Sequence, residues 1–200
     1  MRYSTGRILL LLLGCVVLGV GVAMLLTADL GSDGYSTLVN GVALALDISF
    51  WTANLAIGVL FVGLAAARRL YPGLGTVVQV AVVGGTVSVL LEVMSTPDGL
   101  PARIVLLAAA FPVLAWGIAA YLGSRTGAGP TEAAALAWDP PVPFKWSYSV
   151  FQFLAGLIGW LCGATFGVGT VVVVVLIGPV VARLLPWFTP TRRSLTPEDV

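Results

Sequence analysis

Six apolar segments, each 17 to 21 residues long, constrain the fold of this chain more than any other feature. They are Ile8–Thr27, Trp51–Ala67, Thr76–Met94, Arg103–Gly123, Trp146–Ala164 and Thr170–Pro186. A helix needs roughly 20 apolar residues, within a range of ~17–25, to cross the hydrocarbon core of a bilayer. Only 10% of the 200 residues are charged, whereas a soluble domain carries about 25%. The sequence therefore predicts an all-α, polytopic membrane protein.

The chain also contains an internal repeat. The stretch GLGTVVQVAVVGG, residues 73–85, matches GVGTVVVVVLIGP, residues 167–179, at an offset of 94. The turn GSDGYST, residues 31–37, matches GAGPTEA, residues 127–133, at an offset of 96. We therefore expect one transmembrane domain, residues 1–188, with a first repeat at 8–94 and a second at 103–187. Residues 189–200, which end in RRSLTPEDV, are expected to form a cytoplasmic tail.

Each half carries a fourth apolar segment that is too short to span. These segments are Tyr35–Leu46 and Pro130–Trp138, of 12 and 9 residues. A 12-residue helix covers only about 18 Å, little more than half of the hydrocarbon core. We expect both to be re-entrant half helices, whose glycine-rich turns are tolerated at membrane depth only inside the protein or along a wet cavity.

The distribution of basic residues decides between the possible topologies. If the short segments do not cross and the N-terminus is cytoplasmic, Arg103 alone lies outside and nine basic residues lie inside. If the short segments cross, three basic residues lie outside and seven inside. The positive-inside rule favours the first arrangement. Each half then crosses three times, so the second half is inverted relative to the first, with N- and C-termini inside. Eight spanning helices are the alternative.

The two short segments begin with signals for helix N-termini. In the second half Gly129 is expected as N-cap, followed by Pro130, Thr131 and Glu132, which stands at the third helical position. Proline loses no hydrogen bond at the first helical position. A carboxylate in the first turn is stabilised by the positive end of the helix dipole. In the first half Asp33 is the expected N-cap, followed by Gly34, Tyr35 and Ser36. The two N-termini are expected to approach a central site from opposite sides.

The residue types present exclude several classes of function. The chain has no histidine, and the sequence shows neither a metal-ligand cluster nor a phosphate-binding P-loop. The formal net charge of +1 gives no reason to expect a nucleic-acid partner. We therefore expect a protein that is not an enzyme and that uses no metal or cofactor. Its expected partners are membrane lipid, an unidentified small solute and, as a possibility, a second copy of the chain.

At GPTEAAAL, residues 129–136, and GATFGVGTVVVVVLIGPVV, residues 163–181, the chain resembles the YczE-like branch of the YczE/YyaS/YitT group of bacterial membrane proteins. The resemblance covers roughly residues 8–187. It implies a small multi-pass protein of the bacterial cytoplasmic membrane with a transport-type function. In that group the first turn often carries an aromatic–acid pair. Here the aromatic is Tyr35, the acid is replaced by Ser36, and the acid of the second half is Glu132.

These features together favour a small-solute permease or channel with a central site between the two half-helix N-termini. The residues expected to bind the solute are Glu132, Ser36, Asp33, Tyr35, Thr131, Gly129 and Gly34. The alternative is a non-catalytic membrane scaffold, or a substrate-binding subunit that works with partner proteins.

Overall fold

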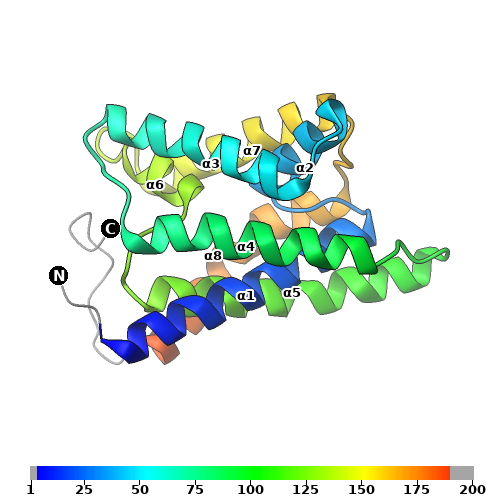
Figure 1. Cartoon of the computed structure of the whole chain (residues 1–200), viewed down its shortest axis with the longest axis horizontal. Helices are drawn as coiled ribbons and strands as arrows, with labels where there is room; N and C mark the ends of the chain where they lie inside the picture. Colours follow the sequence, from blue (N-terminus) through cyan, green and yellow to red (C-terminus); the bar gives the residue numbers. More distant parts are fainter. Residues whose placement is uncertain (1–3, 190–200) are drawn as a thin grey trace.

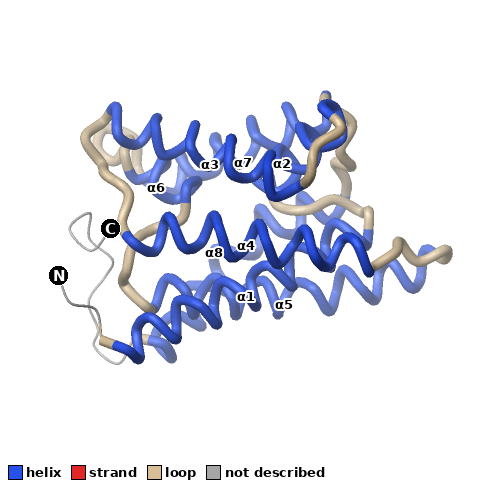
Figure 2. The backbone as a smooth tube through the Cα atoms, in the orientation of Figure 1, coloured by secondary structure: helices blue, strands red, loops and turns tan. Residues whose placement is uncertain are grey.

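A computed structural model describes residues 4–189, apart from the side chains of Phe144 and Lys145. Within that range all the regular secondary structure is helical, and loops join the helices (Figure 2). The eight helices are α1 (Thr5–Ala28), α2 (Gly34–Leu46), α3 (Phe50–Ala67), α4 (Leu74–Val93), α5 (Leu100–Gly123), α6 (Pro130–Leu136), α7 (Phe144–Leu161) and α8 (Val168–Phe188). The prediction of an all-helical polytopic membrane protein is confirmed. Of the expected tail, all but Thr189 lies outside the described residues.

Five of the helices, α1, α3, α4, α5 and α8, are long and apolar enough to span a membrane. The sixth long helix, α7, has 18 residues but carries polar side chains such as Tyr148 and Gln152 in its first half. Large apolar side chains are exposed along the outside of the bundle, for example Val59 at 65% and Val105 at 68%. Such an exterior is stable in lipid, where apolar side chains lose nothing by exposure.

The helices form two layers (Figure 1). The first layer contains α1, α4, α5 and α8, and the second contains α2, α3, α6 and α7, with α3 packed against α4 where the layers meet. Helices of the first half pack against helices of the second half: α1 against α5, α2 against α7, and α3 against α6. Each short helix therefore packs against the third helix of the other half.

Glycines allow α1 and α5 to approach with their backbones almost in contact. A Cβ atom on Gly21 would lie 2.7 Å from the backbone nitrogen of Leu114, and a Cβ atom on Gly117 would collide with the backbone of Leu18. Adding the repeat offset of 96 to 21 and 18 gives 117 and 114. The same contact is thus made twice, with the roles of the two halves exchanged.

The starts of α4 and α8 show the same exchange. The backbone N–H of Gly75 donates to the carbonyl of Thr126 in the second half's turn, and that of Gly169 donates to the carbonyl of Leu30 in the first half's turn, both at 2.8 Å. A threonine one residue further along each helix, Thr76 or Thr170, accepts the N–H of the preceding glycine cap. Each turn is therefore held by the opposite half.

The two short helices begin inside the bundle and run toward opposite ends of it. Figure 1 shows the chain turning back into the bundle after the end of α1, before α2 starts. The chain turns back in the same way after α5, before α6 starts, near the other end of the molecule. The helices have 13 and 7 residues, against the 12 and 9 expected from the sequence. Asp33 is the N-cap of α2 and Gly129 that of α6, as predicted.

Candidate functional site

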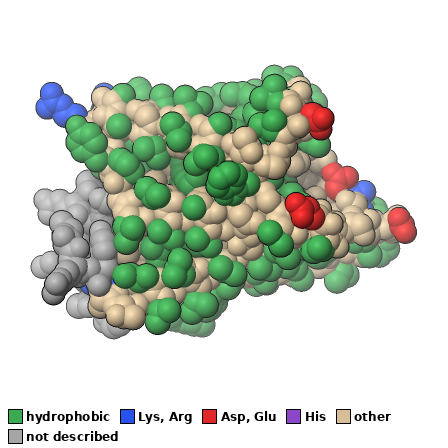
Figure 3. All heavy atoms as spheres, in the orientation of Figure 1, with side chains coloured by type: hydrophobic (Ala, Val, Ile, Leu, Met, Phe, Trp, Pro, Cys, Tyr) green, Lys and Arg blue, Asp and Glu red, His purple; other side chains and the backbone are tan. Residues whose placement is uncertain are grey.

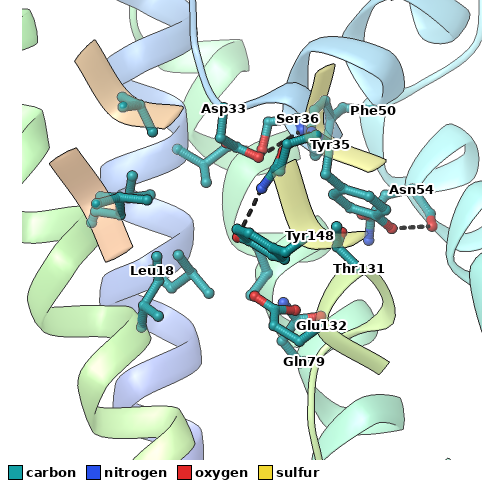
Figure 4. A pocket seen from close by; sticks show the side chains of 17 residues that line it. Leu18, Asp33, Tyr35, Ser36, Phe50, Asn54, Gln79, Thr131, Glu132 and Tyr148 are labelled. Carbon is teal, nitrogen blue, oxygen red and sulfur yellow. Dashed lines mark hydrogen bonds between the residues drawn. The ribbon is translucent and has the colours of Figure 1, made fainter. Parts of the chain in front are cut away.

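The starts of α2 and α6 border one interior cavity of about 50 Å³ (Figure 4). Every one of the eight helices contributes side chains to it. The lining residues are Leu18 and Val22, Asp33, Tyr35 and Ser36, Phe50 and Asn54, Gln79 and Val83, Leu114 and Ile118, Thr131 and Glu132, Tyr148 and Gln152, and Val173 and Ile177. A water molecule needs about 10–15 Å³ of such volume, so the cavity has room for a few waters or one small ion.

The lining residues are equivalent in pairs. An offset of 96 relates Leu18 and Val22 to Leu114 and Ile118, and also relates Tyr35 and Ser36 to Thr131 and Glu132. The other pairs are Phe50 with Tyr148 and Asn54 with Gln152, at an offset of 98, and Gln79 with Val173 and Val83 with Ile177, at 94. Only Asp33 has an equivalent, Gly129, that does not line the cavity. The cavity therefore lies where the two halves meet.

In the first half, the start of α2 is closed by side chains of the protein itself. The Asp33 carboxylate accepts the backbone N–H of Ser36 through Oδ2 at 3.0 Å. The backbone N–H of Tyr35 donates to Oε1 of Gln152, on α7, at 3.0 Å. Asp33 Oδ1 is buried and has no hydrogen-bond partner among the described residues.

In the second half, Glu132 is the carboxylate that faces the cavity. It follows Pro130, which has no N–H to donate. A Cβ atom placed on Gly129 would lie 2.5 Å from Glu132 Oε2 and 2.9 Å from Gln79 Nε2, so the carboxylate and the Gln79 amide both lie against this cap. The fully buried Tyr121 hydroxyl lies near Glu132 without a well-oriented hydrogen bond.

A chain of hydrogen bonds runs from the first turn along the cavity to Tyr148. Because Gln152 accepts from Tyr35 through Oε1, its amide nitrogen is directed to Tyr148, and Nε2 donates to the Tyr148 hydroxyl at 2.8 Å. Asn54 donates to the carbonyl of Val80 at 2.8 Å, which ties α3 to α4. In Figure 4 the Tyr148 ring stands between Asp33 and Glu132, and it interacts electrostatically with both carboxyl groups.

The structure brings five of the seven predicted solute-binding residues into this cavity. Glu132, Asp33, Ser36, Tyr35 and Thr131 all line it. Gly34 and Gly129 lie at the same turns but contribute backbone rather than lining surface. A Cβ atom on Gly34 would collide with the backbone of Gln152, so this glycine is required for the contact between α2 and α7.

The residues that sequence reasoning did not include in the candidate site are three aromatic side chains and three amides: Tyr148, Phe50, Tyr121, Asn54, Gln79 and Gln152. All six except Tyr121 line the cavity. One signal was present: each amide side chain interrupts an otherwise apolar helix, and Asn54 and Gln152 are equivalent in the repeat. Nothing in the sequence marked Tyr148, because tyrosine is also common at membrane interfaces.

The cavity and the two ends of the molecule carry different sets of charged side chains. Two carboxyl groups line the cavity, and no lining residue among those described is basic. Arg68 and Arg69 lie at the end of the molecule where α3 finishes, and acidic side chains gather at the other end (Figure 3). A buried carboxylate without a cationic partner is costly, so this site favours a proton or a cation as its complement.

Two comparisons with known proteins show similarity over most of the chain. Residues 5–186 match a family model described as a family of unknown function (DUF6198). A Haemophilus influenzae protein, described as an uncharacterized protein, is 27% identical over 188 residues, which is 92% of this chain and 84% of the other. No solved structure matches.

Proposed function

The chain belongs to a family of unknown function (DUF6198), and we propose that it is a membrane permease or channel for a small solute. The observation that carries this proposal is the single cavity lined by all eight helices in equivalent pairs. Transporters built from two repeats bind their substrates at the repeat interface, beside broken or half helices. The resemblance to the YczE-like group supports the same reading.

The proposal includes an orientation in the bacterial cytoplasmic membrane. We infer that α2 and α6 are re-entrant half helices and that the two halves are inverted relative to one another. The termini then lie on the cytoplasmic side together with Arg7, Arg68, Arg69, Arg125 and Arg183, and Arg103 lies on the other side. This distribution follows the positive-inside rule.

The small cavity implies a closed state of the proposed cycle. A volume of about 50 Å³ admits a small ion or a few waters but no larger solute. In this proposal, the helices that line the cavity separate to admit the solute from one side at a time. No chemical reaction is part of the proposal.

Osmotic swelling of liposomes that contain the purified full-length protein tests the function. Swelling is followed by light scattering with glycerol, urea, sodium chloride or ammonium chloride as the external solute. We expect at least one of these solutes to enter faster than in protein-free liposomes. Val22→Phe, which fills the cavity from α1, should slow this entry at least tenfold, because the added ring occupies the path.

Val16→Phe is the matched control, since Val16 lies on the same helix and is 42% exposed on the outside of the bundle. It should leave the flux unchanged. If Val22→Phe does not fold, Ile118→Phe places the same ring from the equivalent position on α5. Wild-type liposomes that take up none of the solutes, or a folded cavity-filling variant with full flux, would favour the alternative role as a scaffold or substrate-binding subunit.

A further inference from the structure

We propose that the central cavity binds a small monovalent cation, either an alkali ion or an ammonium-type ion, between Asp33 and Glu132. The inference rests on the proposed function, because it names the class of solute or coupling ion for the same cavity.

The amide groups that would bind an anion at the start of α2 are already in use. The N–H of Ser36 donates to Asp33 Oδ2, and the N–H of Tyr35 donates to Gln152 Oε1, both at 3.0 Å. The N–H of Thr37 donates to the Asp33 carbonyl at 2.9 Å. Since each of these donors has an acceptor within the protein, an anion arriving here would meet carboxylates rather than exposed amides.

At Asp33, in contrast, an acceptor is left without a donor. Asp33 Oδ1 is a buried carboxylate oxygen that lines the cavity and lacks a hydrogen-bond partner in the described structure. Glu132 supplies a second carboxyl group, and none of the described lining residues is a lysine or an arginine. A buried carboxylate that is ionised and unpaired is strongly unfavourable, so in its ionised form this site calls for a cation to supply the missing positive charge.

The arrangement of the two carboxyl groups favours a monovalent ion. Figure 4 shows Asp33 and Glu132 on opposite sides of Tyr148, so they address the cavity from two directions. Calcium requires six to eight oxygen ligands, and magnesium retains several waters in an octahedral shell. A cavity of about 50 Å³ has no room for an ion that keeps several waters. An ion bound here must shed most of its waters, and this costs a singly charged ion far less than a doubly charged one.

Thermal unfolding of the purified full-length protein in detergent tests the assignment. The protein is titrated with sodium, potassium, ammonium or methylammonium chloride, with N-methylglucamine chloride holding the ionic strength constant. A ligand that binds only the folded state raises the unfolding temperature with concentration. We expect at least one small cation to do so, and the four salts distinguish alkali from ammonium-type ions.

Two variants locate the binding to this cavity. Asp33→Asn keeps the N-cap, because Asn caps helices as well as Asp, and Glu132→Gln keeps the size of the side chain. Each should raise the cation concentration for half-maximal stabilisation at least tenfold. Asp47→Asn is the control, since Asp47 is an exposed carboxylate at the other end of α2, and it should leave that concentration unchanged.

The inference is overturned if no small cation stabilises the wild-type protein beyond N-methylglucamine, or if both cavity variants respond like the wild type. Stabilisation by magnesium or calcium chloride alone would overturn the monovalent assignment. The swelling assay separates this inference from the proposed function. Flux of a neutral solute without cation stabilisation refutes the cation site alone, and cation stabilisation without flux of any solute refutes transport alone.

Discussion

The two ends of the molecule differ at positions that the repeat makes equivalent. At one end Arg103 forms an ion pair with Asp29 at 2.6 Å and donates to the carbonyl of Ala28 at 2.7 Å, which caps α1. Subtracting 96 from 103 gives Arg7, and adding 96 to 29 gives Arg125. A pair of opposite charges at one end thus corresponds to two arginines at the other. The two halves match in sequence, and at these positions their charges distinguish the two ends of the molecule.

The two turns at the cavity differ in a second way. The first turn has its carboxylate at the N-cap, Asp33, and a serine at the third helical position. The second has glycine at the N-cap and its carboxylate, Glu132, at the third position. Both carboxyl groups nevertheless line the same cavity. Each turn therefore supplies one carboxyl group to the cavity, but from a different position in the turn. An alignment of the two halves places Ser36 opposite Glu132, so it shows the acid of the first turn as missing.

The short helices also differ in how closely they pack. The helix α2 contacts α7 through Gly41 and Gly159, whose added Cβ atoms would collide with the facing backbone. At the equivalent positions stand Ala137, which caps the C-terminal end of α6, and Phe61, which lies in α3. We infer that the bulkier pair keeps α6 farther from its partner. This difference accompanies the 13-residue length of α2 against 7 for α6.

The largest effect is expected from Gly159→Ala, which should break the close contact between α2 and α7. The new Cβ atom would collide with the Thr37 carbonyl and lie 2.6 Å from the Leu38 nitrogen, and backbone atoms cannot move aside easily. We expect a loss of about 3 kcal/mol in unfolding free energy, the upper part of the range for overpacking. Thermal and denaturant unfolding in detergent measure it.

Gly63→Ala is the matched control for that substitution. Gly63 lies within α3 and has no atom within 4 Å of an added Cβ. Alanine should stabilise the helix there by up to about 1 kcal/mol. Equal stabilities for the two variants would show that the tight packing of α2 on α7 does not contribute to stability.

An intermediate effect is expected when the second turn is converted to resemble the first. Gly129→Asp should cost about 1–2 kcal/mol, because its Cβ atom would lie 2.5 Å from Glu132 Oε2. Adding Glu132→Ser removes that obstacle and restores the Asp–Ser pattern of α2. The double variant should regain more than half of the lost stability in the same unfolding assay. If the second substitution adds to the loss instead, the two turns are not structurally interchangeable.

The smallest effect on stability is expected from two cysteine substitutions that report on the ends of the molecule. Gly99→Cys and Arg69→Cys, placed in a variant without Cys15 and Cys162, lie at exposed positions and should change stability by less than about 0.5 kcal/mol. In intact bacterial cells, a membrane-impermeant maleimide should label the cysteine at position 99 and leave that at 69 unlabelled. Labelling of both from the outside would contradict the inverted arrangement of the two halves.

The sequence by itself determined the elements of this protein. The length of the apolar segments predicted the six long helices, and the start of each short helix was predicted at Asp33 and Gly129, where the structure has it. The sequence also predicted glycine-rich turns before the short helices. In the structure Gly31 and Gly127 adopt positive φ angles of 99° and 135° in these turns. All of these features depend on residues close together in the chain, where length, capping and backbone conformation act directly.

Only the tertiary structure decided which side chains meet in the interior. Tyr35 and Gln152 are 117 residues apart, and Thr76 donates to the carbonyl of Ala128 across 52 residues. In a soluble helix the periodicity of apolar residues would mark the buried face. Here lipid is as apolar as the core, so inward-facing and outward-facing positions carry the same residue types. Tyr148, Asn54 and Gln79 line one cavity with two carboxyl groups because distant segments pack together, and local sequence patterns do not specify that packing.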